Sequence, residues 1–141
     1  MSVLLDTNAC IGIMSRTSQL LFDSYSEHLL AGEPLYISCI SHFELFVGLE
    51  KSLHQYSRQV QLTRLLLTLE VLPFEDQDAL EAARIRAELE RTKQPIGPYD
   101  TLIAGHAIAR NLTLITANVR EFARVPNLKW QDWTIPSQPN P

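Results

Sequence analysis

The sequence predicts an α/β fold in which helices cover both faces of a central parallel sheet of four to five strands, a three-layer α/β/α arrangement. Short runs of strand-forming residues alternate with longer segments whose apolar residues recur at helical spacing. Such alternation implies βαβ crossovers and a sheet that is buried on both faces. No internal repeat or linker divides the 141 residues, so we expect one domain over residues 1–133 and a flexible, proline-rich tail over residues 134–141.

The predicted strands are short. They comprise an apolar run that ends at Leu5, residues 35–40, 71–74 and 112–116, and residues 128–130 as a last edge strand. The predicted helices follow Asp6 and cover residues 18–31, 41–51, 54–70, 75–94, about 98–110 and 117–122. Two details bear on later findings. Ser41 and Glu44 have the spacing of a capping box, and Gly105 within a helix indicates close approach of a neighbouring element.

Composition excludes several classes of protein. No apolar run approaches the roughly 20 residues of a membrane span, and Asp6 interrupts the N-terminus before a secretory apolar region could form, so we expect a cytoplasmic protein. Cys10 and Cys39 have neither disulfide-framework nor zinc spacing, which favours small core residues. The net charge of −4 argues against binding nucleic acid through the whole surface and requires any polyanion to be met locally.

Polar residues gather at the predicted strand ends. Asp6, Glu44 and Asn118 follow three different strands, and the ligand crevice of a parallel sheet lies beyond the carboxyl ends of its strands. Asp100 opens a helix before the fourth strand, and the sequence alone leaves its position relative to the crevice open. Carboxylates that converge there would repel one another unless a divalent cation compensates their charge. Oxygen ligands favour Mg²⁺ or Mn²⁺ over zinc or copper.

Each acid also has a structural explanation. Glu44 could close a capping box with Ser41, and Asp100 could stabilise a helix N-terminus. Asp6 is harder to explain in this way, because an acid at the end of a buried strand loses hydration and no cation lies nearby in the sequence. The four histidines lack metal-ligand spacing, and phosphate-loop, Rossmann and Gly-x-Ser-x-Gly motifs are absent from the sequence.

Several segments carry a family resemblance. They are LDTN at 5–8, Ile37-Ser38, FELFVG at 43–48, GPYDTLIAGHA at 97–107, TANVREF at 116–122 and Asp132-Trp133. In this order, over nearly the whole chain, they resemble PIN-domain proteins of the VapC type, the toxin ribonucleases of type II toxin–antitoxin pairs. The resemblance is strongest to a bacterial subgroup that cuts initiator tRNA in its anticodon loop. It implies a Mg²⁺- or Mn²⁺-dependent endoribonuclease, a homodimer, and a small VapB-type antitoxin that inserts a segment into the active-site groove.

By position, the resemblance makes Asp6, Glu44 and Asp100 the catalytic and metal-binding acids. Many members have a fourth acid where this chain has Asn118, and the subgroup resembles this chain in using asparagine there. Glu121, one helical turn further on, could supply the missing carboxylate directly or through water.

We expect Asn8 and Thr116 to orient the carboxylates. We name Arg16, Arg86, Lys93, Arg120 and Arg124 as candidates for RNA phosphate contacts, although solvated charge or an ion pair is the alternative for each.

Two other functions compete with the nuclease. A PIN-like module that is catalytically silent because of Asn118 would bind only RNA or protein, without a specific divalent site. A phosphoacceptor receiver-like domain shares the parallel-sheet layout, but it would need an adjacent acid pair after the first strand, where this chain has Asp6-Thr7-Asn8.

Overall fold

The computed structural model describes residues 1–137 and contains one parallel sheet with the strand order β3-β2-β1-β4-β5. The strands are β1 (Val3–Leu5), β2 (Leu35–Ser38), β3 (Glu70–Leu72), β4 (Thr113–Ile115) and β5 (Trp130–Gln131). The helices are α1 (Thr7–Ser15), α2 (Gln19–Leu30), α3 (Cys39–Lys51), α4 (Gln55–Leu66), α5 (Asp76–Arg91), α6 (Pro98–Ala109) and α7 (Val119–Phe122). The predicted three-layer fold with a parallel sheet is confirmed.

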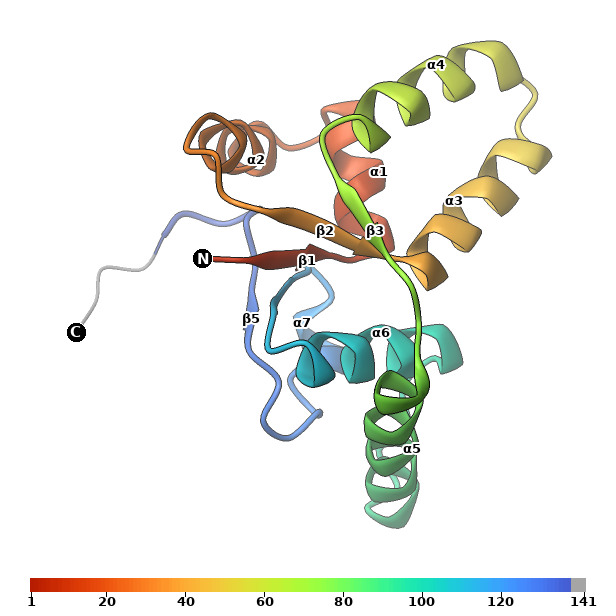
Figure 1. The fold of residues 1–141 in the computed structure, drawn as a ribbon, viewed down its shortest axis with the longest axis vertical. Helices are drawn as coiled ribbons and strands as arrows, with labels where there is room; N and C mark the ends of the chain where they lie inside the picture. Colours follow the sequence, from red (N-terminus) through yellow and green to blue (C-terminus); the bar gives the residue numbers. More distant parts are fainter. Residues whose placement is uncertain (138–141) are drawn as a thin grey trace.

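Two layers of helices enclose the sheet (Figure 1). Val3 and Leu5 of β1 pack into a core with α1 to α4, whereas Leu4 between them packs into a second core with α5, α6 and α7. Successive side chains of a strand point to opposite faces, so a strand covered on both sides needs an uninterrupted apolar run. All three residues are fully buried, which explains the apolar sequence before Asp6.

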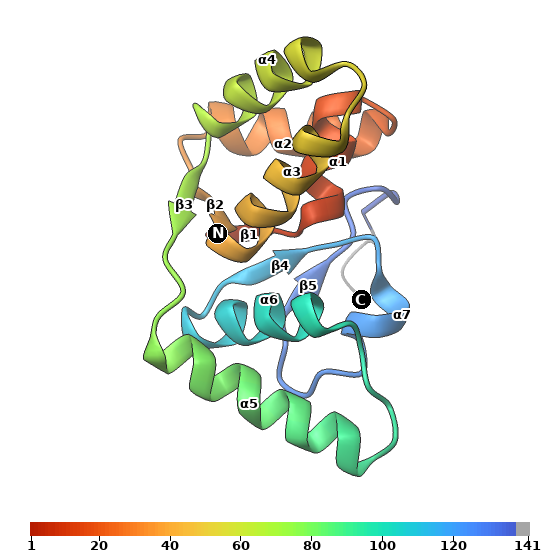
Figure 2. The same ribbon diagram turned by 90° about the vertical axis from the view of Figure 1, so that its right-hand side faces the viewer.

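Helix α6 lies between the sheet and α5 (Figure 2). A Cβ atom at Gly105 would lie 2.5 Å from the backbone nitrogen of Ala82 in α5. Only glycine therefore lets the two helices approach this closely. The predicted close approach at Gly105 is confirmed, and it fixes the position of the helix that begins beside Asp100.

The start of α3 differs from the prediction. We expected a strand through Ile40 and a capping box formed by Ser41 and Glu44, but the strand ends at Ser38, whose Oγ accepts a hydrogen bond of 3.1 Å from the Ile40 amide as the N-cap. Ser41 is fully buried inside the first turn. The capping-box prediction is therefore wrong, because an earlier serine caps the helix, and Glu44 is left available for another role.

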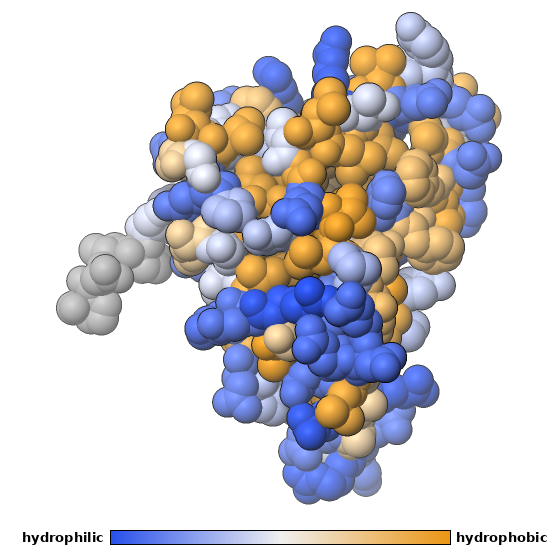
Figure 3. Space-filling model, viewed as in Figure 1, coloured by the Kyte–Doolittle hydropathy of each residue, from blue (hydrophilic) through white to orange (hydrophobic). Residues whose placement is uncertain are grey.

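The two helical layers differ in surface character. Hydrophobic residues gather over the region of α3 and α4, and hydrophilic residues dominate around α5 (Figure 3). Exposed apolar side chains in the first region include Phe46, Leu53 and Leu67. Within residues 1–137, every helix is too short or too polar to cross a membrane.

The predicted tail begins inside the described residues. The Thr134 amide donates a 2.8 Å hydrogen bond to Asp132 Oδ1, and the Thr134 hydroxyl donates a second hydrogen bond to the same oxygen. Thr134 is therefore fixed locally. Residues 138–141 lie outside the described part of the chain, so the flexibility of residues 134–141 stays a prediction.

Candidate active site

Asp6 is the acid at the end of the central strand β1. Its side chain is 3% exposed and caps α1 by accepting a 2.7 Å hydrogen bond from the Ala9 amide. The Thr116 hydroxyl, at the end of the neighbouring strand β4, also hydrogen-bonds this carboxylate. Burial nevertheless raises the pKa of Asp6 to about 6, with smaller contributions from the charges of Glu44 and Asp132. Asp6 is therefore held in place without a cation to stabilise its charge.

Glu44 reaches the same end of the sheet from the second turn of α3. Its Oε1 accepts a 2.7 Å hydrogen bond from Thr7 Oγ1, and the Thr7 and Ser41 hydroxyls lie 3.1 Å apart. Thr7 directly follows Asp6 in the chain. The start of α1 thus positions two acids at once, one through a backbone amide and the other through a side-chain hydroxyl.

Asp100 enters from the first turn of α6, which begins with Pro98 after Gly97. Burial raises the pKa of its carboxyl group, as do a hydrogen bond to Glu121 and the negative charges of Glu121, Asp6 and Glu44. Three chain segments that are far apart in the sequence therefore bring carboxyl groups within electrostatic reach of Asp100. The sequence left the position of Asp100 open. In the structure, Asp100 belongs to a group of four acids that we call the acidic cluster: Asp6, Glu44, Asp100 and Glu121.

Asn118 and Glu121 complete the arrangement from the segment after β4. Asn118 Nδ2 donates a 2.9 Å hydrogen bond to Glu121 Oε2, and the Asn118 amide donates to Thr116 Oγ1 at 2.9 Å. Asn118 occupies the N-cap position of α7 but makes no side-chain capping bond. Its amide therefore orients Glu121 beside Asp100, and its carbonyl oxygen is not used by that bond.

The acidic cluster has the charge of a cation site. Among residues 1–137, no ion pair joins any of the four acids to a lysine, arginine or histidine. In the same residues no group of three or more His, Cys, Asp or Glu side chains is already arranged so that it could hold a metal ion. Mg²⁺ commonly keeps several waters and uses one or two carboxylates, so an open cluster of oxygens fits that ion. Unpaired buried charge and an all-oxygen donor set are the observations that favour it.

The supporting residues differ partly from those we named. Thr116 contacts both Asp6 and Asn118, as its predicted orienting role requires. Asn8 is exposed, and no hydrogen bond of the described residues joins it to an acid, so its predicted role stays a prediction. We did not predict that Thr7 binds Glu44, and we assigned no role to Asp132. Their signals were a hydroxyl beside Asp6 and an acid directly after the last strand.

The five basic residues do not form one patch through their described contacts. The Arg16 guanidinium lies 4.3 Å from the centre of the Phe22 ring, Arg86 pairs with Glu90, and Arg124 donates to the Pro95 carbonyl at 3.0 Å. Lys93 and Arg120 are exposed. Arg124 thus attaches the end of α7 to the loop before Asp100. A role of the five residues in phosphate binding stays a prediction.

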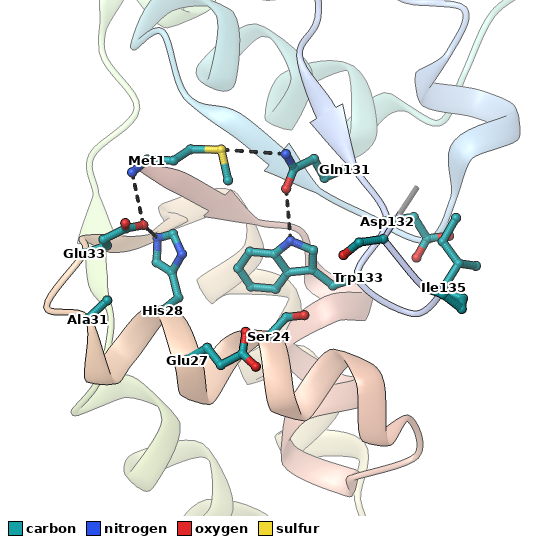
Figure 4. Close-up of a pocket in the computed structure, with 12 residues that line it drawn as sticks. Met1, Ser24, Glu27, His28, Ala31, Glu33, Gln131, Asp132, Trp133 and Ile135 are labelled. Atoms are coloured by element: carbon teal, nitrogen blue, oxygen red, sulfur yellow. Dashed lines mark hydrogen bonds and ion pairs between the residues drawn. The ribbon is translucent and has the colours of Figure 1, made fainter. Parts of the chain in front are cut away.

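A large cavity of about 530 Å³ lies elsewhere, near the N-terminal end of β1 (Figure 4). There the Met1 ammonium and His28 Nε2 lie 3.0 and 3.1 Å from the same oxygen of Glu33. Trp133 packs beside His28, with ring centres 5.6 Å apart. This cavity contains none of the four acids, so its size does not make it the catalytic site.

The fold and the site together define a class of protein. Its members are three-layer α/β/α domains that carry a cluster of carboxylates at the carboxyl ends of their strands. Residues 3–128 match the PIN domain family. The tRNA(fMet)-specific endonuclease VapC of Salmonella typhimurium is 38% identical over 92% of this chain and 96% of its own length. Ribonuclease VapC2 of Rickettsia felis is 36% identical over 94% of this chain and 98% of its own length.

Solved structures agree with the sequence relatives. VapBC2 from Rickettsia felis, bound to a promoter DNA fragment, contains a chain that superposes with a TM-score of 0.88 and 34% identity, covering 94% of this chain and 99% of that chain. A chain of DNA-bound VapBC from Salmonella typhimurium superposes with a TM-score of 0.87 and 37% identity, covering 94% of this chain and 98% of that chain. The chain therefore belongs to the PIN-domain family, and within it to the VapC-type toxin ribonucleases.

Proposed function

We propose that the protein is a Mg²⁺-dependent endoribonuclease, with Mn²⁺ as a substitute, and that it hydrolyses phosphodiester bonds as the toxin of a toxin–antitoxin pair. The observation that carries the proposal is the convergence of Asp6, Glu44 and Asp100: the charge of Glu44 contributes to the raised pKa of both aspartates, and among residues 1–137 no ion pair joins any of the three to a cationic side chain. VapC-type relatives named as ribonucleases support the reaction class. We expect it to act in the cytoplasm, where its RNA is found.

Asp6 and Asp100 would hold the ion, and Glu44 would complete its shell or bind an attacking water. When bound, the ion supplies neutralisation of phosphate charge and a lowered pKa for a coordinated water. The protein's own contribution is orientation: Thr116 and the Ala9 amide hold Asp6, and Thr7 holds Glu44. We expect products with a 3′-hydroxyl and a 5′-phosphate.

Glu121 is the fourth acid in this proposal. It replaces the charge that many family members have at the position of Asn118, because the Asn118 amide directs Glu121 toward Asp100. The side-chain carbonyl of Asn118 would serve as a neutral ligand. The number of bound ions, one or two, depends on the negative charge that Asn118 and Glu121 together contribute to the site.

The substrate we propose is tRNA, with the initiator tRNA anticodon loop as the specific target, in line with the name of the Salmonella relative. A VapB-type antitoxin is the proposed partner, as in the similar VapBC complexes. A groove of about 240 Å³ between α1, α3 and α4 is lined by Glu44 and by apolar residues that include Ile11 and Leu45. An apolar antitoxin segment in this groove would end beside the acids. We also expect a homodimer.

Brief expression in a cell without the antitoxin, followed by sequencing of newly formed RNA 5′ ends, tests both the reaction and the substrate. We expect one dominant cleavage position for the wild-type chain and none for Asp6→Asn or Asp100→Asn. Purified protein should cleave the same RNA with Mg²⁺ and stop when EDTA is added. Unchanged cleavage by both variants with Mg²⁺ would refute the proposal.

A binding module without turnover is the second candidate, and Asn118 in place of an acid is the observation that favours it. Titration calorimetry with Mn²⁺ separates the two. The nuclease requires a saturable site that Asp6→Asn abolishes, whereas the binding module requires none.

A further inference from the structure

A chain of polar side chains crosses the interior beside the proposed active site, and no role assigned so far uses it. Asp78 in α5, His106 in α6 and Ser38 at the end of β2 are each 0% exposed. His106 Nδ1 lies 2.8 Å from Ser38 Oγ, and His106 Nε2 lies 3.6 Å from Asp78 Oδ2. Asp78 in turn accepts two 3.0 Å hydrogen bonds from Arg110. Buried polar groups arranged in series fix the relative position of the elements that carry them.

The order Ser38, His106, Asp78 has the form of a nucleophile triad, but access excludes that function. All three side chains are fully buried, so no substrate reaches the Ser38 hydroxyl. The 3.6 Å separation between Nε2 and the carboxylate is also too long for a hydrogen bond. The series Ser38, His106 and Asp78 therefore has a role within the structure of the protein and not toward a substrate.

The contacts with Ser38 and Asp78 together favour one tautomer of His106. Ser38 Oγ already accepts a hydrogen bond from the Ile40 amide, and its one hydrogen is free for donation to Nδ1. A proton on Nδ1 would instead leave the lone pair of Nε2 facing the Asp78 carboxylate at 3.6 Å, which is repulsive, so the proton is assigned to Nε2 and Nδ1 is the acceptor. Burial lowers the pKa of His106, which agrees with a neutral ring. Asp78 is held against Arg110 and accepts the Glu75 amide at 2.7 Å, so the charge that selects this tautomer is fixed.

The two ends of the Ser38–His106 bond belong to the helices that carry the acids. Ser38 is the N-cap of α3, which bears Glu44, and His106 lies in α6, which bears Asp100. The ring of His106 is also fixed by Phe74, whose ring centre lies 5.3 Å away in a T-shaped arrangement. Gly105 presses the same turn of α6 against α5. A displacement of α3 relative to α6 would therefore change this bond and the separation of Glu44 and Asp100 together.

We propose that His106 is a positioning residue of the nuclease site: as a neutral acceptor oriented by Asp78, it binds the N-cap serine of α3 and so sets the spacing of Glu44 and Asp100 for the divalent ion. This inference rests on the proposed function for its metal. It assigns to His106 no contact with RNA and no proton transfer.

Two substitutions separate positioning from general stability. His106→Asn places an amide oxygen near the position of Nδ1 and can accept from Ser38, whereas His106→Gln extends its amide toward Asp78 and leaves Ser38 without its acceptor. Loss of an outer contact to a metal site typically costs about 10- to 100-fold in affinity or activity. We expect His106→Gln to weaken Mn²⁺ binding about tenfold and to lower kcat with KM for RNA unchanged. His106→Asn should stay within about threefold of the wild-type values for Mn²⁺ affinity and kcat.

The matched control is His28→Gln, because His28 is also buried, at 8% exposure, but it contacts Glu33 near the N-terminus. It should lower the melting temperature without changing Mn²⁺ affinity per folded molecule. Folded His106→Gln protein with wild-type Mn²⁺ affinity, or His106→Asn protein as impaired as His106→Gln, would overturn the inference.

A measurement without metal or variant keeps the inference apart from the proposed function. In ¹⁵N NMR spectra of the wild-type protein at pH 7, we expect unprotonated Nδ1 and protonated Nε2 for His106. A proton on Nδ1 would refute the positioning mechanism even if the protein cleaves RNA. Wild-type protein that binds no Mn²⁺ would refute the proposed function, and His106 would then lose its role toward the metal as well.

Discussion

Thr7 Oγ1 donates a 2.7 Å hydrogen bond to Glu44 Oε1, which ties the residue after the first acid to the second. Thr7 therefore connects the N-terminus of α1 to the second turn of α3. Because Asp6 caps the same helix, any change at this helix start affects both acids.

Replacement of Thr7 by valine keeps the side-chain shape but removes the hydroxyl. We expect RNA cleavage to fall about tenfold, mainly in kcat, because Glu44 loses the neutral donor that orients it. Initial rates at saturating Mg²⁺ provide the measurement. Thr63→Val, on the exposed face of α4, is the control and should retain the wild-type rate. Equal rates for both variants would show that Thr7 does not orient Glu44.

Asp6→Asn should be inactive and yet more stable than the wild-type protein at pH 7. The raised pKa means that the folded state binds the Asp6 proton more tightly than the unfolded state, so stability falls as the pH rises from about 4 through about 6. The shift from 3.8 to about 6 corresponds to roughly 3 kcal/mol, an upper estimate for the gain from a neutral amide. Urea unfolding at pH 5 and pH 7.5, without divalent ions, measures the effect. A loss of stability at both pH values would contradict the assignment of an unpaired buried charge.

Divalent ions should stabilise the wild-type protein more at pH 7.5 than at pH 5. Below about pH 6 the Asp6 carboxyl binds a proton, which competes with the metal, and the raised pKa of Asp100 acts in the same direction. Thermal unfolding with millimolar Mn²⁺ should show a higher melting temperature at pH 7.5, and EDTA should reverse it. The same increase at both pH values, or in Asp6→Asn, would place the stabilising ion elsewhere.

Much of the fold follows from local sequence pattern. The uninterrupted apolar run before Asp6 predicts a strand that is covered on both faces. The structure agrees, because all three residues of β1 are buried. The boundary at Ser38 was missed, since Ser38 and Ser41 are both suitable caps and Cys39-Ile40 suits either a strand or a helix. Parallel pairing that ends with Ser38 opposite Leu72 decides between them, and this contact is not local.

From the sequence alone, only the site residues that directly follow a strand could be predicted. Asp6 stands out because burial of an acid without a cation is costly. Asp100 could be placed only through the resemblance, since the start of α6 depends on how closely α5 packs at Gly105. His106 gave no signal, because its partner Ser38 is 68 residues away and a single buried histidine has no characteristic spacing.

Arg110→Met should be among the most destabilising substitutions outside the acidic cluster. Asp78 is fully buried and depends on Arg110 for two hydrogen bonds, so the variant leaves an uncompensated buried charge. Breaking one side of such a pair costs about 3–5 kcal/mol in a fully buried setting, and partial exposure of Arg110 makes about 3 kcal/mol the expected value. Urea unfolding measures it. Arg84→Met removes an exposed pair with Glu81 and should cost less than about 1 kcal/mol.

A pair of glycine substitutions tests the packing that fixes α6. Gly105→Ala would place a Cβ atom 2.5 to 2.7 Å from Ala82, two of the three contacts being with backbone, so α6 must move away from α5. We expect a loss of about 1–3 kcal/mol in unfolding free energy together with weaker RNA cleavage, since Asp100 is carried by the displaced helix. Gly48→Ala, within α3, has no atom within 4 Å of the added carbon and should instead gain up to about 1 kcal/mol from helix propensity. Opposite signs for the two substitutions would support the close approach at Gly105, whereas a stabilising Gly105→Ala would mean that α5 and α6 are not in contact there.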